Sequence, residues 1–166
     1  HAELGQRWLT PTPLPDAWVD GDEATYHAWR LRLGVPEGWH DAIFERSFLL
    51  ELGYDAVGAV DFAKGCYVGQ EVTARSKHRG QRRKYLHHIT TETEEGSLPP
   101  AGTAITAGQD EQKLALGDMR SHAGTVGLAM VRADRLHQAR EASSPLLAGA
   151  TPVQIRALPW LASSLT

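Results

Sequence analysis

Lys64-Gly65-Cys66-Tyr67-Val68-Gly69-Gln70-Glu71 (residues 64–71) contains the only cysteine of the 166-residue chain, together with two glycines. Gly65 permits a tight backbone turn beside the thiol, and the positive charge of Lys64 two residues earlier favours the thiolate form. We therefore interpret Cys66 as a candidate reactive cysteine. The alternative is a small, buried apolar residue, as most free cysteines are.

The pattern that follows predicts a short helix. Glu71 and Arg75 stand four residues apart, as on one face of a helix. Residues 65–69 would then form a turn at the helix N-terminus, where backbone N–H groups favour a thiolate or a nearby anion. Gln70 offers both a donor and an acceptor to a ligand, or it caps the helix.

Before this stretch, a helix is predicted from about Glu23 to Leu33. Asp22 can cap it, and Gly34 followed by Pro36 ends it. Trp29 on this helix is expected to pack in the core rather than to bind a ligand.

A second helical or irregular segment is predicted from Trp39 to about Leu52. Its apolar side chains are expected to point toward a core, and they are Ile43, Phe44, Phe48 and Leu49. Glu51 has two interpretations. Its carboxylate accepts hydrogen bonds from a ring N–H and amino group at the edge of an apolar wall, or it is an exposed acid at a helix end.

Residues 75–84 are the most basic run of the chain, with Arg75, Lys77, Arg79, Arg82, Arg83 and Lys84. Such a run binds a polyanion, for example a polyglutamate tail, a phosphate or RNA, or it is a solvated hinge. Tyr85 is the only aromatic residue here, so we do not expect nucleic acid as a partner.

Short strands are predicted after Lys84. They cover residues 85–91, 102–106, 114–119, 124–132 and 153–158, and a helix is expected at 133–142. Five short strands in about 80 residues indicate a small antiparallel barrel or sandwich. His87 and His88 are adjacent and point to opposite faces of a strand, and no zinc-type cluster is found. We predict no metal site.

The composition limits the remaining classes. With 42% hydrophobic and 22% charged residues the chain is globular, and its net charge of −3 indicates no general affinity for nucleic acid. One cysteine excludes an internal disulfide, so a reducing compartment and a cytoplasmic location are expected. No apolar run approaches the roughly 20 residues that span a bilayer, so no membrane association is expected.

The central residues resemble a known family. Glu51, Asp55 and Phe62, then residues 64–71 and Thr73-Ala74-Arg75, are similar to the signature of YgfZ-type folate-binding proteins, relatives of the glycine-cleavage T protein (aminomethyltransferase). The resemblance implies an α+β chain. Residues 1–78 would form the C-terminal part of the GcvT-like folate-binding domain, and residues 79–166 a C-terminal β-barrel domain. Family members are usually nearly twice this length, so the chain is expected to begin inside the folate-binding domain.

The resemblance also implies a function. It predicts a tetrahydrofolate-binding accessory factor in iron–sulfur cluster assembly or repair, with iron–sulfur client or assembly proteins as partners and Cys66 as the catalytic residue. The expected folate-binding residues are Glu51, Lys64, Tyr67, Gln70, Glu71 and Arg75. One alternative is a folate-dependent aminomethyl or one-carbon transferase. Another is an interaction module whose barrel docks on a client protein.

Overall fold

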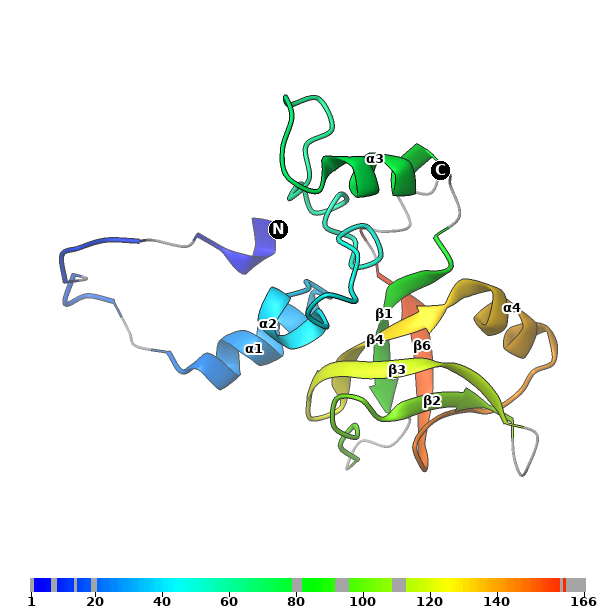
Figure 1. Cartoon of the computed structure of the whole chain (residues 1–166). Coiled ribbons are helices and arrows are strands. Elements are labelled where there is room, and N and C mark those ends of the chain that lie inside the picture. Colours follow the sequence, from blue (N-terminus) through cyan, green and yellow to red (C-terminus); the bar gives the residue numbers. More distant parts are fainter. Residues whose placement is uncertain are drawn as a thin grey trace.

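The computed structural model describes residues 2–6, 9–13, 15–18, 21–78, 82–91, 96–108, 113–158 and 160. Helical elements come first along the chain, and strands follow (Figure 1). The elements are η1 (Ala2–Leu4), α1 (Glu23–Arg32), α2 (Gly38–Asp41), α3 (Gln70–His78), β1 (Lys84–Thr91), β2 (Ala104–Ala107), β3 (Leu114–Ala123), β4 (Val126–Arg132), α4 (Ala133–Glu141), β5 (Leu146–Ala148) and β6 (Thr151–Ala157).

The described strands form a closed antiparallel barrel in the order β1-β4-β3-β2-β5-β6. This confirms the expected α+β class and selects the barrel over the sandwich. The sequence predicted five of the six strands, and it missed β5, which has only three residues. The expected domain division between residues 78 and 79 stays a prediction, because residues 79–81 lie outside the described part of the chain.

The barrel interior is one apolar core. Alternate residues of a strand point to opposite faces, so Ala129 and Val131 of β4 face inward while Leu128 and Met130 face outward. Leu136 on α4 belongs to the inner cluster. β4 is therefore buried on both faces, and it reads as a continuous apolar run rather than an alternating one.

The outer face of β4 forms the base of a second core with α1. Leu31, Leu86, Leu128 and Met130 are buried there together. His88 on β1 extends this contact, because its Nε2 lies 3.1 Å from the carbonyl oxygen of Leu31. Helix α1 therefore lies against the side of the barrel, as Figure 1 shows.

Helix α1 begins and ends where the sequence predicted. Asp22 Oδ1 accepts a hydrogen bond from the backbone N–H of Thr25 at 2.5 Å, and Gly34 follows the helix with φ +70°. The expected core position of Trp29 is wrong. Its side chain is 44% exposed, and its Nε1 donates to the carbonyl of Glu3 at 3.0 Å. Leu31 fills the contact with the barrel, so Trp29 lies on a different side of the helix.

Residues 42–58 are a series of turns rather than a helix, and α2 ends at Asp41. The expected core positions in this segment are also wrong, since Ile43, Phe44, Phe48 and Leu49 are all exposed. Leu50 and Leu52 of the same segment are buried instead. The apolar run therefore has two faces, and only one of them packs on the described core.

A buried polar network joins α1, α2 and β3. Arg30 on α1 donates to Asp41 on α2 through Nη1 at 2.7 Å, and Asp41 also accepts from the hydroxyl of Ser121 on β3. The backbone N–H of Glu37 donates to the same carboxylate at 2.8 Å. Arg30 and Asp41 are both 1% exposed, so this network fixes how the two helices sit against the barrel.

Gly117 allows β3 and β4 to approach closely. A Cβ atom at this position would lie 1.9 Å from the carbonyl oxygen of Met130. No other residue type fits there without moving one of the two strands.

Candidate functional site

Gly69 positions the loop that carries Cys66. Its φ of +87° lies in the left-handed region, which glycine adopts at little cost, and α3 begins at the next residue. The side chain of Gln70 accepts a hydrogen bond from the backbone N–H of Tyr67 at 3.1 Å. The backbone N–H of Gln70 donates to the carbonyl of Tyr67 at 3.2 Å. Gln70 therefore ties the loop to the first turn of α3.

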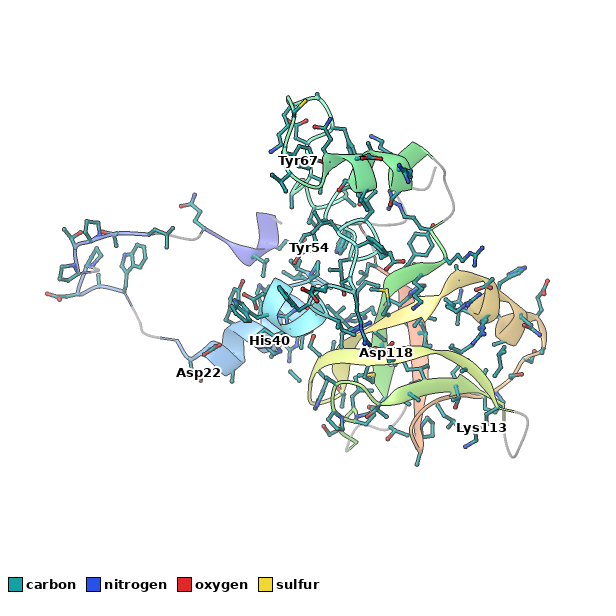
Figure 2. All side chains as sticks on the ribbon, viewed as in Figure 1. Asp22, His40, Tyr54, Tyr67, Lys113 and Asp118 are labelled. Carbon is teal, nitrogen blue, oxygen red and sulfur yellow. The ribbon has the colours of Figure 1, made fainter. Side chains whose placement is uncertain are left out.

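Cys66 lies at a small cavity of about 180 Å³. The residue is exposed, which is not the buried position of the alternative interpretation. Four of the predicted site residues meet at this cavity, and its lining is Phe62, Lys64, Gly65, Cys66, Tyr67, Gln70 and Ala74. Figure 2 shows Tyr67 beside α3, on the side of the molecule away from the barrel.

Two lysine amino groups lie over aromatic rings next to the thiol. Lys64 Nζ is 4.7 Å from the ring centroid of Tyr67, and Lys77 Nζ is 3.5 Å from that of Phe62. Such contacts hold a cation in place by its attraction to the ring face. Phe62 and Lys77 were not predicted from the sequence as site residues. Their separation of 15 residues gives no periodic signal, although Phe62 belongs to the family signature.

Glu71 and Arg75 form an exposed ion pair with each other on α3. Their spacing of four residues places them on one helix face, as predicted. Neither residue lines the Cys66 cavity. An exposed pair of this kind contributes about 0–1 kcal/mol, so its partners remain available to a ligand.

Glu51 lies on a different segment, beside the start of β1. Its carbonyl accepts a hydrogen bond from the N–H of Leu86 at 3.0 Å. Burial raises the pKa of the Glu51 carboxyl above its ordinary value, and the nearby Lys84 partly opposes this shift. A carboxyl group of this kind takes up a proton more readily than an exposed one, and it then donates as well as accepts a hydrogen bond.

The basic run makes several contacts within the chain itself. Arg82 donates to Asp55 at 2.6 Å and to the carbonyl of Leu50 at 3.2 Å, while Arg75 and Lys77 make the contacts described above. Arg79 lies outside the described residues. Arg82 therefore belongs to the local structure, while the polyanion site and the solvated hinge both stay predictions for the rest of the run.

A larger cavity lies under the exposed apolar residues of the turn segment. Its volume is about 430 Å³, and its lining is mostly apolar: Gly38, Ala42, Ile43, Phe44, Glu45, Ser47, Leu49, Leu52, Tyr54, Ala59 and Val60. In Figure 2, Tyr54 marks its place between α2 and the Cys66 loop. This cavity was not predicted from the sequence, because the same apolar residues were expected in a core.

Comparison with known proteins identifies relatives over most of the chain. The family described as CAF17, C-terminal beta-barrel domain, matches residues 82–163. The protein named iron-sulfur cluster assembly factor IBA57, mitochondrial, from Mus musculus is 36% identical over 146 residues, covering 81% of this chain and 38% of the relative. Its counterpart from Homo sapiens is 34% identical over 162 residues, covering 91% and 44%. The homologue from Neurospora crassa is 32% identical over 166 residues, covering 81% and 36%.

The chain spans about two fifths of the length of these curated relatives. Their names place those proteins in mitochondria, whereas the cytoplasmic location expected for this chain stays a prediction. Among the helices in the described part of the chain, none is long and apolar enough to cross a membrane.

Proposed function

The chain belongs to the IBA57/CAF17 family of YgfZ-like and GcvT-like folate-binding relatives, which it matches in the region of the C-terminal β-barrel domain; on that basis we propose that it acts in iron–sulfur cluster assembly or repair. We further propose that it does so as a tetrahydrofolate-binding accessory factor in which Cys66 contacts the cluster. The observation that carries the proposal is the exposed Cys66 at the cavity before α3.

An exposed cysteine suits the transfer or repair of a cluster. Its thiolate is the form that binds iron, and the proton of the thiol leaves when the Fe–S bond forms. A [2Fe–2S] or [4Fe–4S] cluster needs four protein ligands, so one cysteine cannot hold it alone. The cluster is therefore cargo, and the other ligands come from a partner protein or a second copy of the chain. The iron–sulfur assembly role in the names of the relatives supports such a partner.

The folate part of the proposal rests on the larger cavity. Ligand pockets usually measure about 300–1,000 Å³ and are mostly apolar with a few polar groups. The cavity of about 430 Å³ fits this description, whereas the cavity of about 180 Å³ at Cys66 is too small for a whole folate. Glu51 does not itself line this cavity, but it lies in the sequence between two residues that do, Leu49 and Leu52.

These residues would bind the two ends of a folate differently. We propose that apolar side chains of the larger cavity contact the pterin ring, and that Glu51 forms hydrogen bonds with its N–H and amino groups. Lys64, Tyr67 and Gln70 would contact the ligand near Cys66. Glu71 and Arg75 remain candidates, since their exposed ion pair is weak. Bound tetrahydrofolate would supply a carrier for one-carbon units.

The test of Cys66 is complementation of a strain that lacks its own member of the family. The readout is the activity of an iron–sulfur enzyme with the full-length protein carrying Cys66→Ser. We expect loss of the restored activity, while Val68→Ala, a change at a neighbouring exposed residue, restores it fully. Equal melting temperatures of the two variants would show that both fold. Full restoration by Cys66→Ser would contradict the proposed role of the thiol.

The folate proposal is tested separately by equilibrium binding of tetrahydrofolate to the full-length protein. Binding of tetrahydrofolate should raise the melting temperature of the protein. The Glu51→Gln variant should bind tetrahydrofolate more weakly than the parent does. If tetrahydrofolate leaves the melting temperature unchanged, the interaction-module alternative is favoured instead. Turnover of an aminomethylated donor with tetrahydrofolate would favour the transferase alternative.

A further inference from the structure

Three metal-binding side chains meet on the helices beside the barrel. They are His27 on α1 and Glu37 and His40 at α2, and one ligand atom from each lies within 4.8 Å of the others. The rings of His27 and His40 meet edge to face with their centroids 4.4 Å apart, and His40 Nε2 lies 3.9 Å from Glu37 Oε2. We propose that these three side chains bind a divalent transition-metal ion, with zinc as the best match.

Secondary structure explains why the three residues converge. Glu37 is the N-cap of α2, and His40 follows it by three residues, so both side chains lie on one face of this short helix. The buried pair of Arg30 and Asp41 holds α1 against α2, and this brings His27 to the same face. In Figure 2, His40 is seen on α2 where that helix lies against α1.

The donor set is one that zinc uses. Two imidazole nitrogens and one carboxylate oxygen bind zinc at about 2.0–2.2 Å in sites where water takes the fourth position. Around a tetrahedral ion, such ligand atoms are about 3.4 Å apart. The present upper limit of 4.8 Å therefore requires a contraction of about 1.4 Å at most. The side chain of His40 is 43% exposed, which permits this movement and leaves a path for the ion from solvent.

The charges at the site also suit a dication. Glu37 and Asp41 are two carboxylates, and Arg30 contacts both of them. His27 Nδ1 accepts a hydrogen bond from Arg30 Nε at 3.1 Å, so this nitrogen carries the lone pair that a metal ion would use.

Arg30 competes with the metal ion for two of the ligands. Its Nε donates to His27 Nδ1 at 3.1 Å and lies 3.3 Å from Glu37 Oε2. Arg30 Nη2 also lies 3.3 Å from His27 Nε2. Because the guanidinium is planar and Nη1 is bonded to Asp41 at 2.7 Å and to the carbonyl of Val35 at 3.0 Å, metal binding requires His27 and Glu37 to turn away from Arg30. The competition makes binding weaker than at a closed structural zinc site, so the ion should exchange with solution.

This site shares no residue with the Cys66 cavity or with the cavity proposed for folate. It was not predicted from the sequence, because His27 and Glu37 are ten residues apart and belong to different helices. The test of the metal site is therefore independent of the test of the proposed function.

The experiment is a titration of the full chain with zinc against a chromophoric chelator, in a Cys66→Ser background that removes the thiol as a ligand. We expect one zinc ion per chain. The double variant His27→Gln/His40→Gln should weaken binding by about tenfold or more. Cobalt(II) in place of zinc should give the visible absorption of a four-coordinate ion.

The matched control is His137→Gln. His137 is exposed on α4 and lies 3.3 Å from Glu141, so it represents a surface histidine–carboxylate pair outside the proposed site. This variant should bind zinc as tightly as the parent, and circular dichroism should show that all variants fold. The proposal is overturned if zinc does not bind stoichiometrically, if the double variant binds equally well, or if His137→Gln causes the same loss.

Discussion

Replacing Asp41 by asparagine should strongly destabilise the fold. The change keeps the size of the side chain but removes the negative charge that faces Arg30 at 2.7 Å, where both side chains are at most 1% exposed. Removing one partner of a buried ion pair costs about 3–5 kcal/mol. Glu37 Oε2, 3.3 Å from Arg30 Nε, compensates the remaining charge only in part, because Glu37 is partly exposed. A loss of 3 kcal/mol corresponds to a change of more than about 100-fold in the unfolding equilibrium constant.

Urea denaturation followed by circular dichroism measures this loss. With a slope of about 2 kcal/mol/M, the midpoint should fall by roughly 1.5–2.5 M. Asp134→Asn is the control, because Asp134 pairs with Arg132 at the same distance of 2.7 Å but is 58% exposed. Solvent screens the charges of an exposed pair of this kind, so the control midpoint should move little. Equal, small shifts in the two variants would refute the argument that burial decides the strength of this network.

Two further predictions concern the barrel. Gly117→Ala would place a Cβ 1.9 Å from the backbone oxygen of Met130, so the loss of unfolding free energy in urea denaturation should reach or exceed the upper end of about 1–3 kcal/mol. The control is Gly21→Ala, whose Cβ meets no atom within 4 Å, and its stability should stay within about 0.5 kcal/mol of the parent. Equal stability of the two variants would contradict the steric argument. Burial lowers the pKa of His87 and of His88 below the ordinary value of 6.5. As the pH falls below 6.5, these histidines therefore take up protons in the unfolded chain before they do so in the folded chain. The free energy of unfolding should decrease from pH 7.5 toward pH 5. The variant His87→Gln/His88→Gln should have a smaller pH slope than the parent, and an unchanged slope would show that these two groups do not cause it.

Local patterns in the sequence predicted much of the fold. Asp22 and Gly34 mark the ends of α1 because capping and left-handed termination depend on residues within one or two turns. The strands were predicted because each is apolar and bounded by turn residues. β5 escaped detection because three residues are too few to show a period.

Contacts between distant residues could not be predicted in the same way. Arg30 and Ser121 are 91 residues apart, and nothing in either segment indicates that they meet at Asp41. Trp29 was misplaced because an amphipathic pattern shows that a helix has an apolar face but not which residue fills the contact. The convergence of Lys64, Cys66, Tyr67 and Gln70 at one cavity was easier to predict, because they lie within seven consecutive residues and stay together in any compact loop. Their roles as site residues stay predictions.

The exposed apolar residues around the larger cavity affect how the protein behaves in solution. Trp39 and Phe44 are 96% and 88% exposed, and Ile43, Phe48 and Leu49 lie near them in the chain. Environment-sensitive dyes fluoresce on apolar surface of this kind, so they would already be bright with the native chain and would report its melting poorly. Sulfate and other excluded salts strengthen contacts between such surfaces. The folded chain of 166 residues would therefore salt out through this face, with its barrel still folded.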